Sequence, residues 1–121
     1  MSESSKGMHE PAASLNPDVQ DRHRAIASLM EELEAVDWYD QRIEAATDPE
    51  LKSILAHNRD EEKEHASMIL EWLRRRDPAL DRHLRAFLFR EGPIEEHEEG
   101  GAPEAPGDGS LRIGSLKKEE Q

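Results

Sequence analysis

A glutamate and a histidine stand three positions apart near the middle of the chain, in the run Asp-Glu-Glu-Lys-Glu-His at 60–65. Glu62 and His65 have the i, i+3 spacing that places two side chains on one face of a helix. Helical di-iron and di-manganese carboxylate sites use two such Glu-x-x-His motifs together with two further glutamates. This chain contains one such motif, so it can supply half of that ligand set.

The motif falls on the apolar face of its helix. Steps of four and three residues connect one stripe along this segment: Leu51, Leu55, Asn58, Glu62, His65, Ile69 and Trp72. Because apolar residues flank Glu62 and His65 on both sides, we expect both side chains to face a neighbouring helix. A desolvated carboxylate without a partner costs on the order of several kcal/mol, so this placement favours a bound cation. The alternative is a polar contact, Glu–His or Glu–Arg, that fixes helix register.

The preceding segment offers the matching carboxylate. Its stripe at the same spacing is Ala25, Leu29, Glu32, Val36, Tyr39 and Ile43. A hairpin of the two segments offers Glu32, Glu62 and His65, and two hairpins about a two-fold axis double that set to four carboxylates and two imidazoles. Four negative charges balance two divalent ions. Carboxylate and imidazole ligands suit iron, manganese or zinc, and the absence of thiolates disfavours Cu(I).

Helix-start signals set the elements that position these residues. Asn16-Pro17-Asp18 combines a capping residue, a proline suited to the first turn and an acid that complements the helix dipole. Thr47-Asp48-Pro49-Glu50 and Asp77-Pro78 repeat the signal, and Gly92-Pro93 ends the pattern. We therefore predict an all-α fold, with two long helices joined by a short connection and a short C-terminal helix. The short connection makes the long helices antiparallel neighbours.

Composition limits the class of protein. The chain has 121 residues, of which 36% are charged and 35% hydrophobic, so burial against a second copy is expected. A net charge of −12 argues against a nucleic-acid partner. Without cysteine there is no disulfide, thiolate metal site or cysteine nucleophile. No segment has the apolar length of a signal peptide or a membrane span, so we expect a soluble cytoplasmic protein with no membrane partner.

The chain divides into four segments. Residues 1–15 lack periodicity and should be flexible, and residues 16–92 carry the helical signals. Residues 93–109 form an acidic linker that we expect to be disordered, because glycine, proline and glutamate dominate it. Residues 110–121 form a tail of different character, in which apolar residues recur among glycine, serine and charged residues.

The two stretches MEELEAVDWYDQR (30–42) and ILAHNRDEEKEHASMILEWLRR (54–75) closely resemble the encapsulated ferritin family. The resemblance covers about residues 9–94. It implies a half-ferritin that pairs into a dimer, rebuilds a four-helix di-iron bundle at the interface and assembles into a ring-shaped decamer. It further implies a ferroxidase that converts Fe(II) to Fe(III), with two iron ions at each dimer interface.

The resemblance also implies residue roles. Glu32, Glu62 and His65 would be the iron ligands, with Tyr39 beside them in the catalytic centre. An access site would be formed by Glu31, Glu34 and Trp38. A weak outer metal site would be formed by His57, Glu61 and Glu64. Both acidic sites would suit Ca²⁺ or other divalent ions. From the residues alone, a solvated acidic surface is the favoured interpretation of both sets.

The C-terminal run Gly109–Lys117, GSLRIGSLK, is similar to the peptide with which cargo proteins dock on the inner wall of an encapsulin shell. Its docking residues would be Leu111, Ile113, Gly114 and Leu116. Short apolar anchors on a tether bind weakly alone, and many copies in one assembly add avidity. The resemblance thus predicts an encapsulin partner, a location in the lumen of an encapsulin nanocompartment, and delivery of iron for mineral storage there.

Two other classes of function remain. In one, the metal is a structural staple of a non-catalytic helical oligomer, and redox turnover separates this class from a ferroxidase. In the other, the chain is a metal-free scaffold in which Glu62 and His65 only fix register. The scaffold leaves the seam carboxylates of each dimer uncompensated, which disfavours it.

Overall fold

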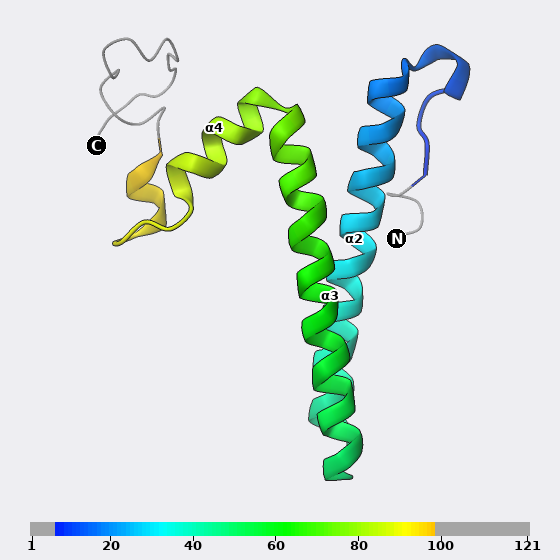
Figure 1. Cartoon of the computed structure of the whole chain (residues 1–121), viewed down its shortest axis with the longest axis vertical. Coiled ribbons are helices and arrows are strands. Elements are labelled where there is room, and N and C mark those ends of the chain that lie inside the picture. The colour runs from blue at the N-terminus through cyan, green and yellow to red at the C-terminus, as the bar shows by residue number, and fades with distance from the viewer. Residues whose placement is uncertain (1–6, 99–121) are drawn as a thin grey trace. The chain divides into compact units, whose positions relative to one another are not determined.

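The computed structural model describes residues 7–98, which form helices joined by short connections (Figure 1). In chain order the elements are η1 (Ala12–Ser14), α2 (Pro17–Ala45), α3 (Pro49–Arg76), α4 (Pro78–Phe87) and η2 (Ile94–His97). No strand occurs in this part of the chain, which confirms the all-α prediction. The chain divides into two compact units after Leu73. None of the described helices combines the length and apolar character that a membrane crossing requires.

The helices begin where the capping signals place them. The Asn16 side chain accepts a hydrogen bond from the Val19 amide at 2.9 Å and caps α2, with Pro17 in the first turn. The Asp48 carboxylate accepts one from the Leu51 amide at 2.8 Å at the start of α3. Asp77 does the same for α4. Each cap satisfies a backbone donor that has no partner inside its helix.

The end of α4 and two short 3₁₀ helices differ from the sequence expectation. Helix α4 ends at Phe87 rather than near Arg90, because the chain turns extended at Leu88 and then left-handed at Phe89, with φ of 61°. A non-glycine residue in that conformation interrupts a right-handed helix. Short 3₁₀ helices also occupy 12–14 and 94–97, in segments expected to be flexible or disordered. The assigned segment boundaries beyond residue 98 lie outside the described residues.

Helices α2 and α3 lie side by side and antiparallel (Figure 1). Near the hairpin turn, Arg59 Nη1 of α3 lies 3.0 Å from Asp40 Oδ1 of α2. Farther from the turn, His65 Nδ1 lies 3.4 Å from Glu32 Oε1. Residue numbers rise along α3 as they fall along α2, which is the pairing that a short connection predicts. The two contacts fix the register of the hairpin.

The hairpin leaves much of its apolar surface exposed. Among its described residues only Ala66 and Leu73 are buried, whereas Met68 is 60% and Leu33 54% exposed. A groove of about 500 Å³ opens between the two helices, lined by Asp21, Arg24, Ala25, Ser28, Met68, Ile69 and Trp72. Apolar surface of this extent on a small chain is typical of an interface. The expected second copy would cover it.

The second compact unit is held by ion pairs around Asp81 of α4. Arg74 pairs with Asp81, and Arg85 Nε lies 2.9 Å from the same carboxylate oxygen. The hydrogen bond from Arg74, with that from Arg85, outweighs partial desolvation and lowers the pKa of Asp81 below its ordinary value. Ala86 is buried in this unit.

The contact between Arg59 and Asp40 predicts a small, measurable effect on the thermal stability of the hairpin. Removing either charge, in Arg59→Gln or Asp40→Asn, should lower the Tm of the metal-free protein by about 2–4 °C, because exposed ion pairs stabilise only weakly. The double variant should lose little more than Arg59→Gln alone, because Arg59→Gln already removes the contact with Asp40 as well as the contact with Asp60. Thermal unfolding followed by circular dichroism measures this, and strictly additive losses would show that the two residues do not interact.

Candidate metal centre

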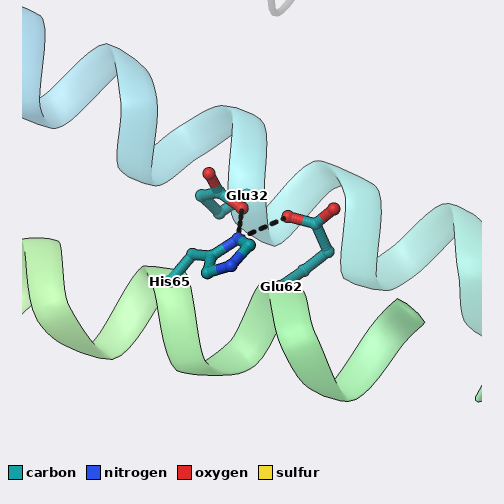
Figure 2. Close-up of side chains that lie close together, drawn as sticks. All are labelled: Glu32, Glu62 and His65. Atoms are coloured by element: carbon teal, nitrogen blue, oxygen red, sulfur yellow. Dashed lines mark ion pairs between the residues drawn. The ribbon is translucent and has the colours of Figure 1, made fainter. Parts of the chain in front are cut away.

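Three of the predicted site residues converge in the seam between the long helices. Glu32 comes from α2, and Glu62 and His65 come from neighbouring turns of α3 (Figure 2). One ligand atom from each side chain lies within 4.8 Å of the others. Among residues 7–98 this is the only group of three or more His, Asp or Glu side chains that meets that condition. The stripe spacing therefore located the cluster correctly.

The imidazole is directed at both carboxylates. His65 Nδ1 lies 3.4 Å from Glu32 Oε1 and 3.5 Å from Glu62 Oε1 (Figure 2). The three side chains are 43%, 24% and 26% exposed, in the order His65, Glu32, Glu62. They are thus only partly withdrawn from water in one chain, and a closed site needs a further covering surface.

Glu62 opposes the ionisation of Glu32. A hydrogen bond with Glu62, then burial and the charge of Glu62, raise the pKa of Glu32 above its ordinary value of 4.5. His65 acts in the opposite direction and is outweighed. When two carboxylates lie close together, ionising both costs free energy, so one of them tends to keep its proton. A cation between them removes that cost.

The histidine responds to the same charges. Burial opposes the imidazolium, but the charge of Glu32 and the close approach of both Glu62 and Glu32 to Nδ1 outweigh it, so the pKa of His65 is raised above 6.5. A metal ion at Nδ1 must therefore displace a proton that is held more tightly than usual. Metal affinity at this cluster should fall as pH drops through the pKa of His65.

One atom of the cluster lacks a partner. Glu32 Oε1 is buried and makes no hydrogen bond within the described part of the chain, because its 3.4 Å contact with His65 Nδ1 lacks hydrogen-bond geometry. A buried acceptor without a hydrogen bond is costly. The cluster offers two carboxylate oxygens and one imidazole nitrogen as ligands, and one of these oxygens has no hydrogen bond. This set fits Fe(II), Mn(II) or Zn(II).

The other predicted site residues do not join this cluster. Tyr39 is half-buried on α2, and the Arg42 guanidinium lies 5.4 Å from its ring centre. Tyr39 is seven residues from Glu32, roughly 10 Å along the helix axis. On the same helix Glu31 is exposed, Glu34 is half-buried and Trp38 is 48% exposed. The catalytic role of Tyr39 and the access site remain predictions.

The predicted outer site is only partly assembled. His57 Nε2 lies 3.7 Å from Glu61 Oε2, and both side chains are largely exposed. Glu64 is exposed and does not complete a three-ligand group with them among residues 7–98. Glu61 has a second neighbour, however, because its Oε1 lies 3.9 Å from His65 Nε2. The i, i+4 spacing of residues 57, 61 and 65 indicates this contact between Glu61 and His65. The sequence-based prediction grouped residues 57, 61 and 64 instead.

Comparison with known proteins gives the family. Residues 7–91 match the family model described as EncFtn-like. An encapsulated ferritin-like protein of Rhodospirillum rubrum is 59% identical over 131 aligned positions, covering 98% of this chain and 94% of the relative. A ferritin-like protein of Thermotoga maritima is 50% identical and covers 86% of this chain and 94% of its own length.

More distant and structural relatives agree. An encapsulin nanocompartment cargo protein of Myxococcus xanthus is 34% identical, covering 72% of this chain and 77% of the relative. The crystal structure of protein ne0167 from Nitrosomonas europaea superposes with a TM-score of 0.71 at 61% identity, covering 73% of this chain and 97% of that one.

The carboxylate repulsion predicts that the metal-free site costs stability. Because the folded pKa of Glu32 is raised, the metal-free fold is most stable where Glu32 is protonated and loses stability as pH rises through that pKa. Glu32→Gln mimics the protonated state, so its metal-free Tm should exceed that of wild type by about 2–5 °C at neutral to mildly alkaline pH. The difference should shrink in acid.

The matched control is Glu44→Gln, an exposed carboxylate on the same helix. It removes the same charge away from the cluster and should leave the Tm nearly unchanged at each pH. A Glu32→Gln protein less stable than wild type across the whole pH range would contradict the repulsion.

Proposed function

Because the chain belongs to the EncFtn-like family, we propose that it is a ferroxidase that oxidises Fe(II) to Fe(III). The observation that carries this proposal is the convergence of Glu32, Glu62 and His65 within 4.8 Å. Two carboxylates and one imidazole are half of the ligand set of a helical di-iron site. In this reading iron is the substrate and passes on as Fe(III).

The site would be completed by a second copy of the chain. Two copies about a two-fold axis supply the four carboxylates and two imidazoles that two iron ions need. The exposed apolar surface of the hairpin, including Leu33 and Met68, supports this pairing, because it has no cover within the described chain. A closed ring of such dimers, a decamer as the resemblance implies, would follow from a second kind of contact.

The chain's own residues would favour the oxidised product. Glu32 and Glu62 would present anionic oxygens to the ion, and these stabilise Fe(III) more than Fe(II). His65 offers a neutral nitrogen once its proton leaves. Two Fe(II) ions each lose one electron. A dioxygen that takes both electrons and two protons leaves as hydrogen peroxide, and a peroxide that does so leaves as two waters.

The remaining site residues would serve this centre. Tyr39 would support it from the next turns of α2. Glu31 and Glu34 would attract Fe(II) at the access site, where Trp38 restricts the path. His57, Glu61 and Glu64 would hold Ca²⁺ or another divalent ion weakly on the outer face, because water competes well at exposed side chains such as His57.

The chain would act as encapsulin cargo. The relatives from Rhodospirillum rubrum and Myxococcus xanthus are named as encapsulated or cargo proteins, which supports a shell partner for this chain. Residues 110–121 would dock on the shell through Leu111, Ile113, Gly114 and Leu116. The protein would then work in the lumen of an encapsulin nanocompartment, and the shell would hold the ferric mineral. The docking residues lie outside the described part of the structure.

A non-catalytic metal-binding oligomer is the second candidate. It is favoured by one observation: the ligands come from two helices, so a metal would staple α2 to α3 whether or not it turns over. A ferroxidase and a staple share the metal site and differ only in redox turnover.

Site variants predict loss of iron oxidation. Fe(II) is added anaerobically to the full-length protein, air is admitted, and the ferric absorbance is followed. Wild type should oxidise iron well above the protein-free rate. Glu32→Ala, Glu62→Ala and His65→Ala should each lose roughly tenfold or more, because even the supporting contacts of metal ligands contribute that much. Glu44→Ala, outside the cluster, should match wild type.

If wild type and all variants match the protein-free rate while wild type still binds iron, the site is a structural staple. If wild type neither binds nor oxidises iron, both proposals fail.

The tail predicts a separable defect. A chain that ends at residue 108 should oxidise Fe(II) at the wild-type rate but fail to co-purify with encapsulin shells when the two are co-expressed. The triple variant Leu111→Ala, Ile113→Ala, Leu116→Ala should behave in the same way, because it removes the apolar anchors and keeps the tether. Loading at the wild-type level in either protein would contradict docking through this tail.

A further inference from the structure

The two nitrogens of His65 face different neighbours. Nδ1 lies between Glu32 and Glu62, at 3.4 and 3.5 Å (Figure 2). Nε2 lies 3.9 Å from Glu61 Oε1, one turn earlier on α3. The ring thus has a cluster of metal-ligating oxygens on one edge and a single carboxylate on the other.

A neutral imidazole that binds a metal through one nitrogen carries its proton on the other. The acceptor at that second nitrogen fixes the tautomer and the ring orientation. For Nδ1 to bind metal, Nε2 must carry the proton, and Glu61 is the carboxylate placed to accept it. The 3.9 Å separation is about 1 Å longer than a hydrogen bond. A small torsional change in the half-exposed Glu61 side chain closes that gap.

We propose that Glu61 is a positioning residue for His65, holding it in the tautomer that presents Nδ1 to the metal. The role rests on the proposed metal site and differs from ligation at the outer site, because Glu61 acts here through His65. A carboxylate at Nε2 also makes the imidazole more basic at Nδ1 and so a stronger ligand.

His57 anchors the far side of Glu61. Its Nε2 lies 3.7 Å from Glu61 Oε2, while Glu61 Oε1 faces His65. Residues 57, 61 and 65 follow one another at i, i+4 and form a line along α3. Glu61 therefore lies between two imidazoles, with one carboxylate oxygen toward each. Each imidazole favours the rotamer seen here over one in which Glu61 points into water.

The test uses Co(II) as the probe, added anaerobically to the full-length protein, and reads both the dissociation constant and the visible ligand-field spectrum. Glu61→Ala should weaken Co(II) binding at the cluster by about 10–100-fold and alter the spectrum, as the loss of a supporting contact does elsewhere. Glu61→Gln keeps an oxygen that accepts a hydrogen bond from Nε2–H and is a poor metal ligand. It should recover most of the affinity and the wild-type spectrum.

His65→Ala defines the loss of the cluster, and Glu44→Ala controls for the removal of one negative charge. If Glu61→Ala binds Co(II) like Glu44→Ala, Glu61 does not position His65. If Glu61→Gln is as weak as Glu61→Ala, Glu61 is itself a ligand and the inference is wrong. If His65→Ala binds Co(II) like wild type, the proposed metal site fails, and the inference fails with it.

Discussion

The central constraint on this structure is that two carboxylates are placed together in one helical seam, where their repulsion must be offset. Glu32 and Glu62 come from different helices and meet beside His65, and their proximity raises the pKa of Glu32. A chain that only needed stability would bury apolar residues there. The seam instead contains a buried acceptor without a hydrogen bond, Glu32 Oε1, within the described structure. A bound cation that prefers oxygen ligands would offset the free-energy cost of burying it.

The incomplete ligand set and the uncovered apolar surface have one common solution. A hairpin with three ligands cannot enclose two ions, and a hairpin with Met68 and Leu33 more than half exposed has not completed its core. The proposed two-fold pairing would meet both needs. Assembly and metal binding would then be thermodynamically linked, because a site that exists only in the dimer stabilises the dimer when it is filled. Within one chain, the ion pair of Arg59 with Asp40 joins α2 and α3 near the hairpin turn.

Much of this fold could be predicted from local rules. Proline and a capping Asn or Asp mark the start of each described α-helix, and the stripe spacing predicts Glu32 opposite Glu62 and His65, as the structure has them. Other features depend on backbone and side-chain conformations that local sequence rules do not specify. The end of α4 depends on a left-handed Phe89, which is uncommon for an aromatic residue. The position of Glu61 between His57 and His65 depends on rotamers, which spacing alone does not determine. The proposed pairing, access site and docking tail concern contacts beyond one chain.

The most direct test of the account is how iron distributes among assembly states. Native mass spectrometry of the full-length protein, with Fe(II) added anaerobically below saturation, resolves monomers from larger species and counts the ions on each. If the site is shared, ions should appear on paired or larger species, approaching two per pair of chains, while monomers stay free of iron. Monomers that take up iron as readily as the pairs would contradict a site divided between two copies.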